Sequence, residues 1–301
     1  MKKKIAITGG TGFVGKELTN ALLNRDTEVF ILTRRPRPPE TRVTYVPWLT
    51  EGAAPEKELE GIDAIINLSG SSINDGRWNE EQQKEIYRSR MTSTAEVLRI
   101  IQALEHKPKT LINASAIGVY APSETITHTE HSQDFGTNFL AKTVHDWESL
   151  AEEAAAFGLR VAYGRFGIIL GKNEGALPLM TLPYKLFAGG PVGSGNQWVS
   201  WVHVHDVARA IMFALDHEEL KGPFNITAPD PKQMRDFGKE IAKALQRPYW
   251  IPVPPLALKL ALGAKSQLVL EGQRVVPAVL ERHGFRFMFP DLQSALADLY
   301  K

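Results

Sequence analysis

The segment that decides the fold is Thr8-Gly9-Gly10-Thr11-Gly12-Phe13-Val14-Gly15, which follows the apolar run Ile5-Ala6-Ile7. The run predicts a strand, and residues 16–24 carry leucines near helical spacing. Glycines three residues apart between a strand and a helix are typical of a dinucleotide-binding turn, because they permit a tight turn, close approach of the pyrophosphate, and tight packing of the helix. We therefore predict that Gly9, Gly10, Thr11, Gly12, Phe13, Val14 and Gly15 bind a dinucleotide.

Strand and helix signals alternate beyond this turn. Apolar runs predict strands, and long segments with helical periodicity separate them. Such alternation predicts an α/β fold, a Rossmann-type doubly wound parallel sheet. The expected strands are 5–7, 28–33, 63–68, 110–114, 159–166 and, later in the chain, 223–227, and the long expected helices are 80–104 and 139–157.

The end of the second strand indicates which dinucleotide is bound. A protein specific for NAD usually carries an acidic residue about 20 residues beyond the turn, where it binds the ribose hydroxyl. Here the chain reads Leu32-Thr33-Arg34-Arg35, and two guanidinium groups suit a 2′-phosphate. The sequence predicts NADP(H), with Thr33, Arg34 and Arg35 as contacts; the alternative is a solvated basic loop before Pro36.

The second half of the chain differs in amino-acid composition. Residues 177–195 contain three prolines and four glycines, which predicts an irregular region that shapes a pocket, and the aromatic residues around it suit a small-molecule substrate. We expect an NADP-binding Rossmann domain at 1–170, to which 200–228 return, and a smaller C-terminal substrate lobe at 171–199 and 229–301.

Composition excludes several other functions. The 301 residues include no cysteine, so thiolate catalysis and cysteine-ligated metals are excluded. The net charge of +1 gives no general attraction to nucleic acid or membranes, and His128, Glu130 and His131 match no zinc spacing, so we predict no metal site and neither partner. The apolar run after Lys2–Lys4 is too short for a signal peptide, which predicts a cytoplasmic protein.

These features resemble the extended short-chain dehydrogenase/reductase superfamily, and more closely its atypical branch of epimerase family proteins with an uncharacterised C-terminal domain. The resemblance covers nearly the whole chain. The segments that carry it, besides the glycine turn, are 67–70 (NLSG), 77–79 (RWN), 114–120 (ASAIGVY), 147–148 (WE), 165–171 (RFGIILG), 189–195 (GGPVGSG), 201–206 (WVHVHD), 225–229 (NITAP), 272–277 (GQRVVP) and 284–285 (GF).

The resemblance implies a catalytic apparatus that this chain only partly has. In the superfamily, a serine after the fourth strand contacts the reacting oxygen, and a Tyr-x-x-x-Lys pair on the next helix relays the proton. Ser115 matches the serine, but Phe139 and Thr143 stand where the tyrosine and lysine belong. Lys142 is one helical position away, about 100° around the axis, and cannot simply replace the lysine.

The sequence therefore does not identify the residue that would donate or accept the proton. Tyr120 follows the fourth strand, at the edge where α/β sheets place ligands, and His203 and His205 lie near the pocket-shaping segment. Each has an alternative role, Tyr120 in packing and the histidines in orienting a loop. Ser115 and Tyr120 are the catalytic residues that we predict.

The sequence thus leaves two hypotheses for function. One is an NADP(H)-dependent oxidoreductase or epimerase-like enzyme that transfers hydride to or from a small substrate, for which a nucleotide sugar is one option. The other is a catalytically silent NADP(H)-binding sensor. The loop after the third strand begins where the nicotinamide should lie, so Gly70 and Ser71 are further predicted contacts. Superfamily relatives often pair through helices that match 80–104 and 139–157, so a homodimer is one possible assembly.

Overall fold

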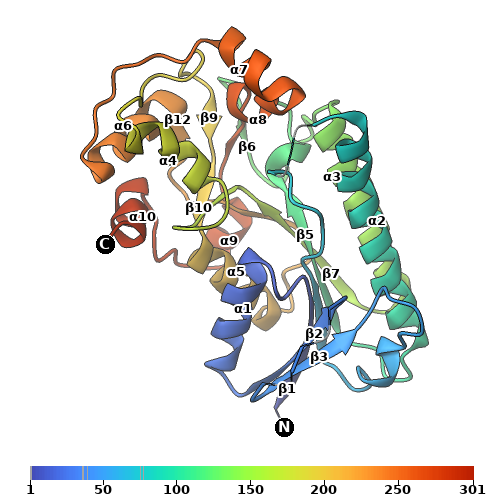
Figure 1. The fold of residues 1–301 in the computed structure, drawn as a ribbon. Helices are drawn as coiled ribbons and strands as arrows, with labels where there is room; N and C mark the ends of the chain where they lie inside the picture. The colour runs from blue at the N-terminus through green and yellow to red at the C-terminus, as the bar shows by residue number, and fades with distance from the viewer. Residues whose placement is uncertain (1, 36, 39, 75, 77) are drawn as a thin grey trace.

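The computed structural model describes residues 2–35, 37–38, 40–74, 76 and 78–301. Within them, seven parallel strands form one sheet in the order β11-β7-β5-β4-β1-β2-β3 (Figure 1). Helices cover both of its faces, which confirms the predicted Rossmann-type architecture. Pro36 of the basic loop and Arg77 of the RWN segment lie outside the described residues.

The strands agree with the apolar runs that predicted them, and the edge strand β3 is an addition that the sequence analysis did not identify. Those of the main sheet are β1 (Lys3–Thr8), β2 (Thr27–Thr33), β3 (Val43–Pro47), β4 (Ala64–Asn67), β5 (Thr110–Ala116), β7 (Arg160–Phe166) and β11 (Gly222–Ile226). Short two-stranded ladders elsewhere are formed by β6 (Thr127–His128), β8 (Ile168–Leu170), β9 (Trp198–Val199), β10 (Trp201–His203), β12 (Lys232–Gln233) and β13 (Arg274–Val275).

Apolar side chains that alternate along the strands build a separate core on each face of the sheet. On one face Ile7 and Ile112 pack with α1 (Phe13–Leu23) and α5 (Val204–Asp216), and on the other Ile65 and Leu111 pack with α2 (Glu80–Ala103) and α3 (Phe139–Glu152). No helix in the described part of the chain is long and apolar enough to cross a membrane. The helices are α1 (Phe13–Leu23), α2 (Glu80–Ala103), α3 (Phe139–Glu152), α4 (Leu177–Lys185), α5 (Val204–Asp216), α6 (Met234–Leu245), α7 (Pro255–Leu262), α8 (Gln267–Leu270), α9 (Ala278–Arg282) and α10 (Leu292–Leu299).

The region predicted to be irregular contains a helix. Although residues 177–195 are rich in proline and glycine, α4 occupies the first half of the segment. Pro178 lies in the first turn, where a proline removes no helical hydrogen bond, and burial of Leu177, Thr181 and Tyr184 against a third core holds α4 in place despite Pro183. Tertiary packing therefore overrides the helix-breaking composition.

The C-terminal segment is joined to the sheet rather than set apart from it. Strand β13 pairs with β6, and Leu280 and Phe285 belong to the same core as Ile5 and Ile7 of β1. A carboxylate reinforces this junction: Glu130 Oε1 accepts the backbone N–H groups of Asn225 (2.8 Å) and Val279 (3.2 Å). Residues of the predicted substrate lobe thus share the core of the predicted Rossmann domain.

We expect Glu130→Ala to lower the free energy of unfolding by about 2–3 kcal/mol, because two buried N–H groups would lose their acceptor. Urea denaturation followed by circular dichroism measures this. Glu124→Ala is the control, since that side chain is exposed nearby and should change stability by no more than about 0.5 kcal/mol. Equal stability of the two variants would refute the proposed junction.

Candidate dinucleotide-binding site

In the glycine turn between β1 and α1, neighbouring backbone atoms lie too close to Gly9 and Gly15 for either position to carry a side chain. Gly9 has a φ of +67°, and a Cβ there would lie 2.8 Å from the carbonyl oxygen of Leu68. A Cβ on Gly15 would lie 2.2 Å from the carbonyl oxygen of Gly9, so this glycine lets α1 approach the turn. The amide of Gly12 closes the turn by donating to the Gly9 carbonyl (3.0 Å).

Gly12 has a different environment, because its surroundings are open. It is exposed, its φ of −83° suits any residue, and a Cβ there would come within 4 Å only of the Gly9 carbonyl oxygen (3.3 Å). Gly12 also begins α1 without a side-chain cap. Uncapped N–H groups at a helix N-terminus attract anions, so the turn fits a pyrophosphate on its open side.

Three other residues of the turn pack against neighbouring parts of the protein. The ring of Phe13 packs against Gly171 and Gly175, where a Cβ would lie 2.3 Å and 2.9 Å from its atoms, so the side chain is directed toward residues 171–175. Val14 packs against the core, and Gly10 is buried against Ile31. All the predicted contacts of this turn therefore lie together at the carboxyl end of β1.

The predicted phosphate-binding residues lie at the end of the neighbouring strand β2. Thr33 Oγ1 accepts the amide of Arg35 (3.2 Å), and the side chains of Arg34 and Arg35 are exposed. Within the described part of the chain neither arginine has an ion-pair partner. The Arg88 guanidinium, and more weakly Arg34, hold the pKa of Glu85 below its usual value, which places Arg34 within electrostatic reach of α2.

The segment after β4 is held beside the glycine turn by a buried hydrogen bond. Thr8 Oγ1 donates to Asn67 Oδ1 (2.6 Å) and accepts the amides of Leu68 (3.1 Å) and Ser69 (3.2 Å). Asn67 in turn donates to Thr94 Oγ1 of α2 (3.0 Å). The ends of β1 and β4 are therefore fixed relative to each other and to α2.

Gly70 and Ser71 continue from this point along α2. The Ser71 amide donates to Ser89 Oγ (3.0 Å) and its hydroxyl to Glu85 Oε1 (3.2 Å), while a Cβ on Gly70 would lie 3.2 Å from Cζ of Arg90. The structure brings both predicted contacts to the same edge of the sheet as the glycine turn. Their contact with a cofactor stays a prediction.

Ser115 belongs to a buried ionic network. Its hydroxyl donates to Glu148 Oε1 (2.5 Å), and Arg165 donates to the same carboxylate through Nε (2.8 Å) and Nη2 (2.7 Å). Ser115 and Arg165 are paired in the β5–β7 register, and Glu148 comes from α3. Phe139 begins α3 nine residues earlier, about 13.5 Å along the helix axis. The structure thus does not place Ser115 level with the start of α3.

Tyr120 joins the same network. Its hydroxyl accepts from Arg165 Nη1 (2.9 Å) and donates to Asn225 Oδ1 (2.9 Å), and its ring stacks on His128. Tyr120 is fully buried, and this burial raises the pKa of its hydroxyl. A raised pKa opposes loss of the proton near neutral pH, so this geometry favours a positioning role for Tyr120 over the predicted catalytic one.

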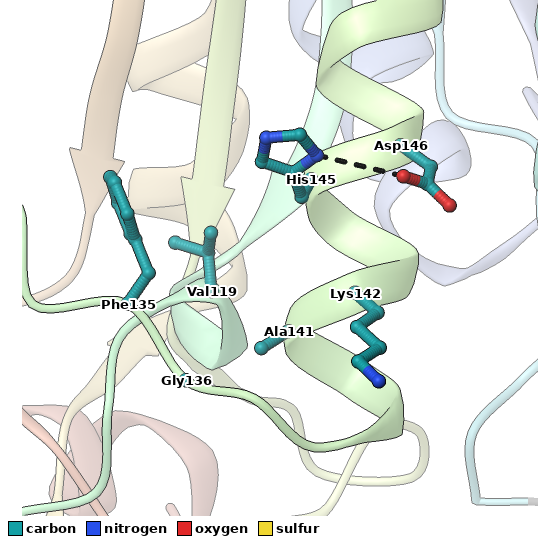
Figure 2. A pocket seen from close by; sticks show the side chains of 7 residues that line it. All are labelled: Val119, Phe135, Gly136, Ala141, Lys142, His145 and Asp146. Carbon is teal, nitrogen blue, oxygen red and sulfur yellow. Dashed lines mark ion pairs between the residues drawn. The ribbon is translucent and has the colours of Figure 1, made fainter.

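The helix position that carries the family's proton relay is apolar here. Phe139 packs edge-on against Trp78, with ring centroids 6.2 Å apart, and the buried hydroxyl of Thr143 donates to the Phe139 carbonyl (2.8 Å). The exposed Lys142 lines a surface depression of about 280 Å³ instead (Figure 2). That depression is lined by Val119, Phe135, Gly136, Ala141, Lys142, His145 and Asp146, and it includes no predicted cofactor contact.

The two histidines considered for proton transfer orient local structure. His203 caps α5 by accepting the amide of His205 on Nδ1 (3.2 Å), and burial lowers its pKa to about 4. It is therefore neutral near pH 7. His205 is exposed, with Nε2 3.6 Å from a carboxylate oxygen of Glu17. Neither contact involves the glycine turn.

The roles of Arg90, Glu148, Arg165 and Asn225 do not follow from the sequence alone. The sequence does indicate that Arg165 has an acidic partner, because an arginine inside an otherwise apolar parallel strand is too costly to bury without one. The identity of that partner depends on where α3 lies across the sheet, which one sequence does not reveal. Asn225 reaches Tyr120 across 105 positions of the chain, again through the order of the strands.

Comparisons with known proteins identify the class to which this chain belongs. Residues 5–227 match the model of the NAD dependent epimerase/dehydratase family, and residues 253–299 match a domain of unknown function, DUF1731. The chain belongs to the NAD dependent epimerase/dehydratase family. This confirms the predicted resemblance.

Relatives with similar sequences extend over the full chain. The epimerase family protein YfhF of Bacillus subtilis is 49% identical, over 98% of this chain and 97% of its own length. A structure of the human epimerase family protein SDR39U1 with NADPH has a TM-score of 0.87 and 31% identity, and the match covers 99% of each chain. A nucleoside-diphosphate sugar epimerase from Corynebacterium glutamicum has a TM-score of 0.78 and 30% identity, covering 99% of this chain and 58% of that one. Together with the glycine turn, these findings support an epimerase-like protein that binds a nicotinamide dinucleotide.

The different surroundings of Gly12 and Gly15 predict different consequences of adding one methyl group. Gly12→Ala should change the free energy of unfolding by less than about 1 kcal/mol but weaken dinucleotide binding about tenfold or more, because the methyl occupies the open side of the turn. Gly15→Ala should destabilise the protein by at least about 2 kcal/mol. Urea denaturation and calorimetric titration with NADPH measure the two effects. Unchanged NADPH affinity in folded Gly12→Ala would contradict the assignment.

Proposed function

We propose that the protein binds NADP(H) in preference to NAD(H) and uses it for hydride transfer on a small carbonyl or alcohol substrate. The observation that carries the cofactor choice is the end of β2, where the exposed Arg34 and Arg35 stand and a carboxylate suited to the ribose hydroxyl of NAD does not. The NADPH in the human relative's structure supports the same choice.

Different residues of this chain would contact different parts of the dinucleotide. The open side of Gly12 and the first turn of α1 suit the pyrophosphate, and the forked guanidinium of Arg34 suits the 2′-phosphate. Gly70 and Ser71, at the end of β4, lie where the nicotinamide half is expected. A bound nicotinamide supplies or accepts the hydride.

The substrate would lie at the carboxyl edge of the sheet, near the end of β5. The predicted role for Ser115 is to polarise the substrate oxygen, and its hydrogen bond to Glu148 offers a second role, in which it positions the end of β5. Because Phe139 has no acidic proton, a proton taken up by the product must come from another group or from water. Epimerisation of a nucleotide sugar is one form that such chemistry could take.

A second candidate function is a catalytically silent NADP(H) sensor. Phe139 and Thr143 favour it, since a phenyl ring packed on Trp78 and a hydroxyl bonded to its own helix leave the usual relay position without an acid or base. Such a protein would bind the dinucleotide and pass its redox state to a partner.

Affinity measurements test the cofactor choice. We expect the wild-type protein to bind NADPH at least about tenfold more tightly than NADH, and Arg34→Ala to reduce NADPH affinity about 10–100-fold with little effect on NADH, because only NADPH carries the 2′-phosphate. Isothermal titration calorimetry measures all four affinities. Tighter binding of NADH by the wild-type protein would overturn the proposal.

Turnover measurements separate the enzyme from the sensor. NADPH-loaded protein is offered aldehydes and quinones, and NADP+-loaded protein is offered nucleotide sugars, while the absorbance of the reduced nicotinamide is followed and the sugars are analysed by chromatography, because epimerisation returns the hydride and leaves no net change in absorbance. An enzyme should change the absorbance or convert a sugar with at least one substrate, and loss of turnover in a stably folded Ser115→Ala variant would indicate the catalytic role. A reduction of only a fewfold would indicate positioning through Glu148, and no turnover across the panel favours the sensor.

A further inference from the structure

Arg90 of α2 is a fixed guanidinium beside the end of β4. Its Nη1 donates to the carbonyl oxygens of Ile86 (2.8 Å) and Ser71 (3.3 Å), and its Cζ lies 5.1 Å from the centre of the Trp147 ring. Since a Cβ on Gly70 would meet Cζ at 3.2 Å, the guanidinium also lies directly against the backbone of Gly70. These contacts orient the group without neutralising it.

The charge of Arg90 is not balanced by an acidic side chain in the described residues. Arg88 and Arg99 on the same helix both form ion pairs, but Arg90 forms none. Burial lowers its pKa to about 10, so the group is still positively charged at neutral pH. A partly buried cation without a counter-ion is costly, and such groups are concentrated at functional sites.

Arg165 shows how a guanidinium in this protein binds a carboxylate, which Arg90 does not do within the described residues. The Nε and Nη2 atoms of Arg165 form a side-on fork that binds both oxygens of Glu148. The same two atoms of Arg90 have no acceptor among the described protein groups, and they are not among the unpartnered atoms that are sealed from solvent. A guanidinium fork of this kind matches two oxygens of a carboxylate or phosphate.

The position of the fork suggests where the oxyanion would come from. The Thr8–Asn67 hydrogen bond fixes the end of β4 beside the glycine turn, and Gly70 follows Asn67 by three residues. Arg90 is therefore next to the strand end that adjoins the glycine turn at Gly9. A phosphate group bound at this turn would lie next to the end of β4, where the Arg90 guanidinium stands against Gly70.

We propose that the Arg90 fork binds an oxyanion at the carboxyl end of β4, and that this oxyanion is the pyrophosphate of the bound dinucleotide. The second half of this proposal rests on the proposed dinucleotide function. Because NADPH and NADH share the pyrophosphate, Arg90 contributes equally to both, whereas Arg34 acts on the 2′-phosphate alone. The anionic group of a substrate is the other source of the same chemistry.

The test compares Arg90→Gln with Arg88→Gln, which removes the same charge from an exposed site on the same helix. Calorimetric titrations with NADPH, NADH and inorganic pyrophosphate are the readout, and circular dichroism melting checks folding. Arg90→Lys, which keeps the charge but not the fork, is a second variant if the glutamine variant is unstable. We expect Arg90→Gln to weaken NADPH and NADH equally, by about tenfold or more, and Arg88→Gln to change both by less than about twofold.

The outcomes distinguish this inference from the proposed function. Equal loss for both dinucleotides supports the pyrophosphate contact, even if Arg34→Ala fails to discriminate between them and the preference for NADP(H) is wrong. Unchanged dinucleotide affinities with weaker binding of inorganic pyrophosphate overturn the cofactor assignment and point to the substrate as the source. Unchanged affinity for all three ligands in folded Arg90→Gln and Arg90→Lys overturns the oxyanion site.

Discussion

The candidate site depends on one buried hydrogen bond, between Thr8 and Asn67. Both side chains are fully buried, and both stand at the carboxyl ends of their strands, where the backbone ladder between β1 and β4 stops. Beyond that point the two chains diverge, one into the glycine turn and the other toward α2. The Thr8 hydroxyl extends the strand pairing by accepting the next two amides of the β4 chain. Together with the backbone hydrogen bond from the Leu68 amide to the Thr8 carbonyl (3.2 Å), this bond fixes the separation between the turn and the chain that leads to Gly70.

The interior behind this edge is unusually polar, and its groups satisfy one another. Asn67 bonds to Asn113 of β5 (2.6 Å), and the Trp147 indole of α3 donates to Thr94 (2.9 Å). Together with the network around Arg165, these bonds connect β4, β5, β7 and β11 to α2 and α3. Unsatisfied groups at such depth would be costly, so the network specifies one relative placement of its elements. The contrast with Arg90, whose fork has no protein acceptor in the described chain, is what makes that residue informative.

Local sequence patterns predicted the fold well, because each strand, turn and helix depends mainly on residues that are consecutive in the chain. The glycine turn and the apolar runs gave the sheet and its first helix, and the arginines after β2 were placed at the expected edge. What could not be predicted depends on contacts between distant residues. The helix α4 persists despite its prolines because the third core buries it, and the environment of Ser115 is set by Glu148, 33 positions later. A single sequence lists these residues but does not show which of them contact one another in the fold.

The junction around Glu130 has a consequence for how this family can change over time. The two matched regions, 5–227 and 253–299, look like separate modules, yet the second supplies Leu280 and Phe285 to a core built largely by the first. Exchange of the C-terminal region between lineages would leave the outer strand β11 without its cover, and the donor core would not fit the recipient. The two regions should therefore be inherited together, as a single folding unit rather than as exchangeable modules.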